Sequence, residues 1–202
     1  RKALSMAIDR ELLTEVGYGK AGAPTCNLVP APAIYASDNT DCLTQDIEGA
    51  KALLEEAGWT DSDGDGVREK DGMKLSLLYQ TSTNAVRQDF QALIKDWWSQ
   101  IGVETELRNL DGSVFFGGEN INRFCDPAYD EMIDELARTG DLDARSALAK
   151  KMNDMLTKDT YTIVPLVNRA RVSAHANSLG GVVLNVWDSE LWNVGDWYRI
   201  KE

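Results

Sequence analysis

The sequence predicts an α/β protein in which a mixed, partly parallel sheet is flanked by helices. Two short segments, 73–79 and 103–107, are rich in the apolar residues typical of strands. Between them, apolar residues at helical spacing over 84–101 predict a long amphipathic helix that Gly102 ends. A strand, a helix and a strand in this order need a crossover, so we expect the two strands to be parallel and connected in the right-handed sense.

The part of the chain before this unit predicts two further helices. The apolar residues of 1–16 lie on one face of a helix, which ends at Gly17. A loop containing several prolines follows. Thr44, or Asp46 just after it, can then cap a second helix that ends at Gly58.

The part after this unit predicts two more helices and several extended segments. The helices cover 127–138 and 143–158, and the extended segments cover 162–167 and 172–174. A tail at 182–198 alternates apolar and polar residues. No internal repeat or low-complexity stretch interrupts this order.

Length and charge exclude several classes of protein. The chain has 202 residues, enough for one generous domain or two small ones. Its net charge of −12 repels phosphate backbones and anionic lipid surfaces, so we do not expect it to bind nucleic acid. No apolar run approaches the roughly 18 residues that span a bilayer. Because the first residues already form a helical pattern, we expect the chain to be the interior of a longer protein.

Catalytic motifs are weak in this sequence. The segment Gly17–Gly22 matches G-x-G-x-x-G, but a dinucleotide fingerprint must follow a strand and begin a helix, and here a predicted helix precedes it. The plainer interpretation is a turn that ends a helix. His175 is the only histidine, and no nucleophile, Walker A or zinc-protease motif is present. We therefore predict that the protein is not an enzyme, with a carboxylate-only hydrolase as the weakest alternative.

An acidic loop over 61–72 partly matches a calcium-binding loop. Aspartates occupy its first, third and fifth positions, a glycine occupies the sixth, and a backbone carbonyl is available at the seventh. The twelfth position is Gly72 where a bidentate glutamate is expected, so a weak structural calcium ion competes with a plain solvated Asp-Gly turn. No other cofactor is expected. The candidate metal ligands are Asp61, Asp63, Asp65, Val67 and, as a substitute, Asp71.

The three cysteines predict one disulfide. Cys26 and Cys42 enclose an irregular loop, and in an exported protein a bond between them would stabilise the fold by about 3 kcal/mol. Cys125 is then left without a partner.

Several segments, taken in order, resemble one family. They are RKALSMAIDR at 1–10, ALLEEAGW at 52–59 with the Asp-Gly loop after it, IGVE at 101–104, RFCDPAYD at 123–130 and IVPL at 163–166. Together they resemble the C-terminal part of a family 5 extracellular solute-binding protein, the oligopeptide- and dipeptide-binding component of ABC importers. The resemblance covers nearly the whole chain.

This resemblance implies one lobe of a class II, peptide-binding, periplasmic-binding-protein-like fold. The intact receptor would close over a peptide or similar solute, in the periplasm or at the cell surface, and deliver it to the membrane subunits of an ABC permease. Residues 1–170 would form the C-terminal lobe, and 171–202 would return through the hinge and pack on the missing N-terminal lobe. With one wall of the cleft absent, we expect the isolated chain to bind solute negligibly.

The sequence departs from the family's pattern near 117–120. Relatives place several tens of residues between segments like 115–118 and 120–123, whereas here only Glu119 intervenes. Either this stretch has been deleted, or it exists and the numbering closes over it. By the resemblance the stretch often carries a cysteine, and its absence would explain the unpaired Cys125.

Two loops are the candidate ligand contacts. Ligands of open α/β sheets bind beyond the carboxyl ends of the strands, and both loops follow a predicted strand. By the resemblance they also correspond to cleft-lining positions. For any single residue of Thr81 to Asn84, a role in capping the next helix is at least as plausible. The candidates are Gln80, Thr81, Ser82, Thr83, Asn84, Asp111, Gly112 and Ser113.

Two functions thus remain to be separated. The first is a solute-receptor lobe that works by domain closure. The second is a calcium-stabilised extracellular interaction module built on Asp61 to Asp71, in which a chelator would lower the melting temperature.

Overall fold

The chain divides into two compact units. The computed structural model describes residues 1–115, 124–170, 173–185, 189 and 191–200. The first unit is Arg1–Arg169 and the second is Ala170–Glu202. The second unit contains one short antiparallel pair, β7 (Leu179–Gly180) with β8 (Tyr198–Arg199).

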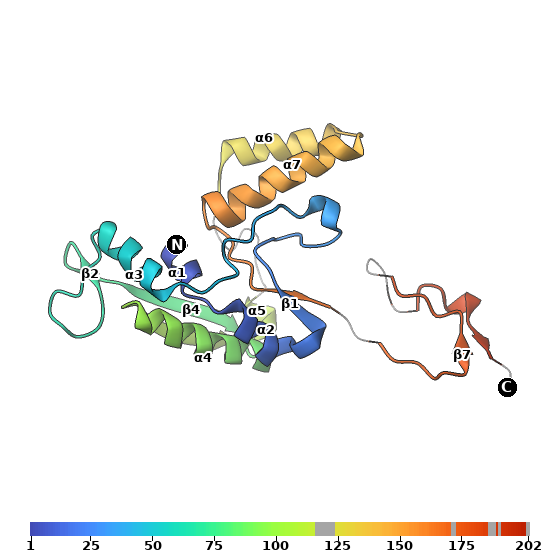
Figure 1. The fold of residues 1–202 in the computed structure, drawn as a ribbon, viewed down its shortest axis with the longest axis horizontal. Helices are drawn as coiled ribbons and strands as arrows, with labels where there is room; N and C mark the ends of the chain where they lie inside the picture. Colours follow the sequence, from blue (N-terminus) through green and yellow to red (C-terminus); the bar gives the residue numbers. More distant parts are fainter. Residues whose placement is uncertain (116–123, 171–172, 186–188, 190, 201–202) are drawn as a thin grey trace. The chain divides into compact units, whose positions relative to one another are not determined.

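The predicted strand, helix and parallel strand are present in the first unit. β4 (Ser76–Ser82) pairs in parallel with β5 (Glu104–Leu110), and α4 (Ala85–Gln100) connects them. Figure 1 shows α4 lying alongside β4. Both strands extend about three residues beyond their predicted ends. The α/β class is confirmed, with one parallel pair and three antiparallel pairs among the described strands.

The predicted strand over 73–79 is split in two. Its first residues form β3 (Met73–Lys74), which pairs with β2 (Glu69–Lys70) as a hairpin. Asp71 and Gly72 connect them with φ values of 52° and 77°. A two-residue turn with both φ values positive is typical of tight hairpins, and Asp-Gly is one of its preferred sequences.

The prediction of one helix over 1–16 is wrong in one respect, because this segment forms two helices. α1 (Lys2–Met6) ends early, and α2 (Arg10–Tyr18) begins after an extended residue, Asp9. The Asp9 side chain accepts a hydrogen bond from the Leu12 amide and so caps α2. The apolar spacing continues across the break, so it does not reveal the break.

A buried arginine explains why the chain turns between these helices. Arg10 is fully buried, yet no carboxylate contacts it in the described part of the chain. Its guanidinium donates to the carbonyls of Ser5 (3.1 Å), Cys42 (2.8 Å) and Pro165 (2.8 Å). Burial lowers the pKa of Arg10 to about 10, so the group remains charged at neutral pH. Arg10 therefore joins three segments that are distant in sequence.

The second predicted helix is confirmed as α3 (Ile47–Glu56). Asp46, rather than Thr44, is its cap, because the Asp46 side chain accepts a hydrogen bond from the Gly49 amide. Gly58, with φ 85°, follows the helix end.

The later helices are also close to their predicted positions. α6 (Pro127–Arg138) and α7 (Leu142–Asp154) lie side by side (Figure 1), and a π-helical turn, Met155–Asp159, extends α7. Of the extended segment at 162–167, only the last residue is part of a strand, β6 (Val167–Arg169). None of the described helices is long and apolar enough to cross a membrane.

Two apolar clusters hold the first unit together. One joins α1 and α3 to the start of β5 through Ala7, Leu54 and Val103. The other joins α2 to α4 through Leu13 and Ile94. The indole of Trp98 packs against both clusters, and its N–H donates to the Leu4 carbonyl at 3.0 Å.

The predicted disulfide is present. Cys26 and Cys42 are bonded, with their Cα atoms 5.7 Å apart. β1 (Gly22–Pro24) leads into the enclosed loop and pairs antiparallel with β6. Cys125 is exposed and forms no disulfide with the described cysteines.

Replacing Arg10 by lysine should strongly destabilise the protein. The N–H groups of a lysine lie on one nitrogen and cannot match the guanidinium fork that reaches three carbonyls. We therefore expect the free energy of unfolding to fall by about 3 kcal/mol. Urea denaturation measures the loss. The matched control is Arg108→Lys, because Arg108 is exposed and its ion pair with Glu106 is also exposed, so its loss should stay below about 0.5 kcal/mol. Equal losses in the two variants would contradict the role assigned to Arg10.

Candidate functional site

The structure brings the two predicted ligand loops together. β4 and β5 are in register from Ser76 opposite Glu104 to Ser82 opposite Leu110, so both strands end at the same edge. Beyond that edge, the Thr83 amide donates to the Leu110 carbonyl at 3.0 Å. The segments 80–84 and 111–113 are therefore neighbours at the carboxyl end of the parallel pair.

The candidate residues differ in their exposure. Thr81 and Ser82 are 6% and 5% exposed, and the Ser82 hydroxyl accepts a hydrogen bond from Arg87 at 2.8 Å. These two residues are buried. Gly112 is half-buried, and the exposed candidates are Gln80, Thr83, Asn84, Asp111 and Ser113.

One of the exposed candidates, Asn84, caps a helix as the plainer interpretation predicted, and Asp111 makes similar local hydrogen bonds. The Asn84 side chain accepts a hydrogen bond from the Arg87 amide at 3.2 Å, at the start of α4. The Asp111 carboxylate accepts bonds from the hydroxyl and the amide of Ser113, at the start of the short helix α5 (Gly112–Phe115). These two hydrogen bonds lower the pKa of Asp111. Gln80 and Thr83 have no such capping role in the described part of the chain.

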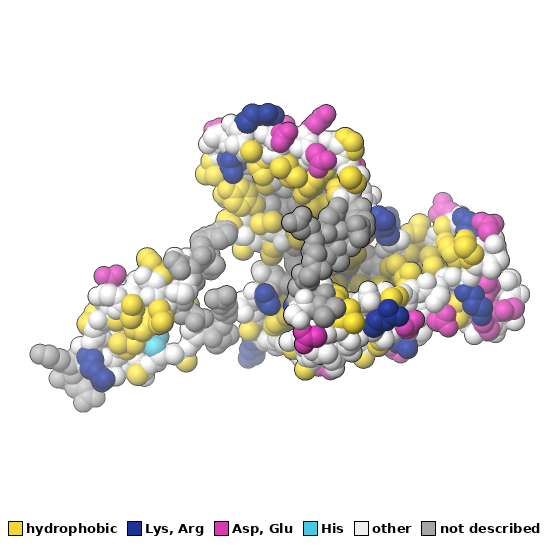
Figure 2. All heavy atoms as spheres, turned by 180° about the vertical axis from the view of Figure 1, so that it is seen from behind, with side chains coloured by type: hydrophobic (Ala, Val, Ile, Leu, Met, Phe, Trp, Pro, Cys, Tyr) yellow, Lys and Arg dark blue, Asp and Glu magenta, His cyan; other side chains and the backbone are white. Residues whose placement is uncertain are grey.

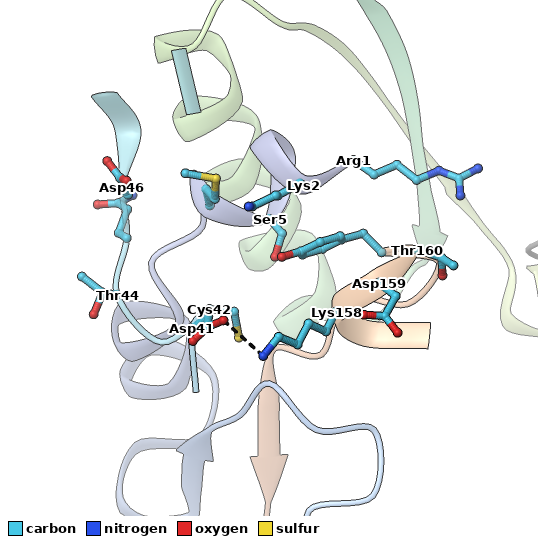
Figure 3. A pocket seen from close by; sticks show the side chains of 13 residues that line it. Arg1, Lys2, Ser5, Asp41, Cys42, Thr44, Asp46, Lys158, Asp159 and Thr160 are labelled. Atoms are coloured by element: carbon cyan, nitrogen blue, oxygen red, sulfur yellow. Dashed lines mark ion pairs between the residues drawn. The ribbon is translucent and has the colours of Figure 1, made fainter. Parts of the chain in front are cut away.

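A pocket lies in another part of the first unit, and none of the candidate ligand residues lines it. Its volume is about 960 Å³, and it is lined by α1, the loop 41–46 and the turn 158–161. Figure 3 shows its side chains, including the ion pair of Lys158 with Asp41 at 3.5 Å. Its walls come from three segments distant in sequence, so no spacing in the sequence could have indicated it.

The carboxylates of the acidic loop lie close together. Asp61, Asp63, Asp65 and Glu69 each offer an oxygen within 4.8 Å of the others. Asp71 lies outside this group, in the turn between β2 and β3, and the Val67 amide donates to Asp65 at 2.9 Å. A hydrogen bond from Lys74 is the main reason that the pKa of Asp65 is lowered. The arrangement offers hard oxygen ligands, which are the kind that calcium prefers.

The glycine-rich segment does not form a nucleotide site. Gly17 lies within α2, where an added Cβ would be 2.6 Å from the Phe90 ring, so this glycine permits close packing of α2 against α4. Gly19 follows the helix with φ 51°. His175, in the second unit, is exposed. The interpretation as a helix-ending turn is confirmed.

Calcium should bind the acidic loop weakly. Gly72 replaces the bidentate glutamate, and Lys74 already neutralises one carboxylate, so we expect millimolar affinity and a small rise in melting temperature. Isothermal titration calorimetry measures the binding. The variant Asp63→Ala should lose the heat of binding, whereas Asp38→Ala, in another exposed loop, should keep it. An unchanged heat in Asp63→Ala, or no heat in the native protein, would favour the plain turn.

Comparison with known proteins gives the family. A family model described as bacterial extracellular solute-binding proteins, family 5 middle, matches residues 1–164. The oligopeptide-binding protein AppA of Bacillus subtilis is 32% identical over 117 residues, 56% of this chain and 22% of AppA. The nickel-binding periplasmic protein of Escherichia coli is 31% identical over 127 residues, 61% of this chain and 24% of that protein.

Comparison with solved structures shows which fold the chain has. The structure of AppA from Bacillus subtilis in complex with a nonapeptide matches 99% of this chain and 47% of that one, with a TM-score of 0.72 and 19% identity. The fold is therefore the class II periplasmic-binding-protein-like fold, and the chain spans less than half the length of these relatives. Because the family model covers well over half of the chain, this protein belongs to the family 5 bacterial extracellular solute-binding proteins.

Proposed function

We propose that this chain is the C-terminal lobe of the substrate-binding component of an ABC importer. The intact protein captures a peptide or similar solute between two lobes and hands it to the membrane subunits of a permease. The observation that carries the proposal is the meeting of two polar loops at the carboxyl ends of β4 and β5, where ligands of open α/β sheets bind. The protein acts in the periplasm or at the cell surface, and it binds its solute without changing it chemically.

The names of the relatives support a peptide as the solute. They include oligopeptide-, dipeptide- and murein peptide-binding proteins, and the solved AppA structure holds a nonapeptide. One relative is named for nickel, so the family name alone does not specify the solute. An exposed amide at Gln80 and an exposed hydroxyl at Thr83 suit the hydrogen-bonding groups of a peptide backbone.

The second unit supports a two-lobed receptor. Several of its large apolar residues are exposed. The exposed fraction is 64% for Leu184, 59% for Leu191 and 61% for Tyr198. Exposure of this kind marks surfaces that are covered by another part of a protein. We assign this cover to the N-terminal lobe of the intact receptor, on which 171–202 would pack. The join near 117–120 lies outside the described residues.

The isolated chain should bind peptides negligibly. If half the contacts of a micromolar site are lost, about −8 kcal/mol becomes about −4 kcal/mol, which corresponds to a dissociation constant near 1 mM. Titration of the chain with a library of short peptides, followed by tryptophan fluorescence, checks this, with the full-length protein as the positive control. Saturable binding to the isolated chain in the low micromolar range would place the whole site within this lobe.

Within the full-length protein, the strand-end side chains should matter for affinity. We expect the double variant Gln80→Ala/Thr83→Ala to bind peptide more weakly by about tenfold, because two hydrogen bonds to the solute are lost. The matched control is Ser76→Ala/Glu104→Ala, which removes exposed side chains at the opposite end of the same two strands. Equal affinities of the two double variants would contradict the placement of the site.

A further inference from the structure

The chain contains a set of dipeptides with a known route of spontaneous modification. Aspartate is followed by glycine four times, at 63–64, 65–66, 71–72 and 111–112. At such a pair the glycine nitrogen can attack the aspartate Cγ, because glycine has no side chain to obstruct the approach. An N–Cγ bond forms, the N–H and Cγ–OH bonds break, and the proton and the hydroxyl leave together as water, which gives a succinimide. Water then opens the ring to aspartate or to isoaspartate, in which the backbone runs through Cβ.

Two of the attacking nitrogens are held by one residue. The Gly64 amide donates to Asp61 Oδ1 at 2.7 Å, and the Gly66 amide donates to Asp61 Oδ2 at 3.0 Å. Each nitrogen must leave its hydrogen bond before it can turn toward the preceding aspartate. Asp61 therefore restrains attack at both Asp63 and Asp65.

The carboxylates at these positions are restrained as well. Asp63 accepts a bond from the Asp65 amide at 3.1 Å, and Asp65 accepts one from the Val67 amide at 2.9 Å. Asp65 also pairs with Lys74.

The pair at 111–112 is restrained in a similar way on the acid side. Asp111 Oδ1 accepts a bond from the Ser113 hydroxyl at 2.6 Å and another from the Ser113 amide at 2.9 Å. These bonds restrain the rotation of the Asp111 carboxylate.

The pair at 71–72 lacks all of these restraints. Asp71 and Gly72 are both exposed, and no hydrogen bond within the described part of the chain engages the Asp71 carboxylate or the Gly72 amide. Asp71 also has φ 52°, a left-handed conformation that residues with side chains rarely adopt.

We propose that Asp71 is the site at which this protein forms isoaspartate, and that Asp61 protects Asp63 and Asp65 from the same reaction. The extra backbone atom would lengthen a two-residue turn, so the pairing of Lys70 with Met73 would be lost in the modified molecule. The loss would be local, because β2 and β3 have two residues each.

The test compares the folded chain with an unfolded control of the same sequence. The chain and a synthetic peptide covering 59–75 are incubated at neutral pH, and isoaspartate at each position is measured by proteolytic mapping with mass spectrometry. In the peptide, Asp63, Asp65 and Asp71 should react at similar rates. In the folded chain, Asp71 should react at least about fivefold faster than either of the others, the factor that one hydrogen bond of ordinary net strength provides. Equal rates in the folded chain would overturn the proposal.

Two variants test the roles of the individual residues. Asp71→Glu should remove isoaspartate from the turn, because a glutamate would need a less favourable six-membered ring. Asp61→Ala should raise the rates at Asp63 and Asp65 by about fivefold, whereas Ser62→Ala, whose hydroxyl donates to Glu69, should leave them unchanged. Unchanged rates at both positions in Asp61→Ala would overturn the protective role. If that variant loses its loop structure, the comparison of folded chain and peptide still decides.

Discussion

The fold of the first unit depends on one buried cation. Arg10 has no carboxylate partner among the described residues and is held instead by the carbonyls of Ser5, Cys42 and Pro165. A buried guanidinium is tolerated only where its N–H groups are satisfied, so these three segments must meet around it. The break between α1 and α2 and the position of the disulfide loop follow from this requirement.

The segments around Arg10 also help to position the strands that carry the candidate site. α1 lies against Trp98 of α4, and α4 in turn packs on β4, where Gln91 donates to the Tyr79 carbonyl at 2.8 Å. The helix thus connects α1 to the parallel pair. The solute contacts that we propose at the carboxyl end of this pair therefore lie on short loops held by a rigid element.

Local signals in the sequence were reliable, and long-range ones were absent. Neighbouring residues or a single crossover were enough to predict the cap at Asn84, the bond between Cys26 and Cys42, and the parallel strands. The break at Asp9 was missed because the apolar spacing continues across it, and the carbonyl of Pro165 that holds Arg10 lies 155 residues away. The pocket beside Lys158 was also not predicted, because its walls come from segments that are distant in sequence. In the candidate site, sequence reasoning found the two loops, but it did not show that Thr81 and Ser82 are buried.

The central claim is that solute binds at the carboxyl ends of β4 and β5. The most direct measurement is amide hydrogen exchange of the full-length protein with and without a mixture of short peptides. The account predicts that peptide slows exchange at 80–84 and 111–113, while the loop 41–46 and the turn 158–161 exchange as before. Protection at 41–46 and 158–161, with the strand ends unchanged, would contradict it and place the solute in the pocket of Figure 3. Figure 2 shows hydrophobic and charged side chains on the surface of the protein, and the exchange measurement reports on the two candidate positions separately.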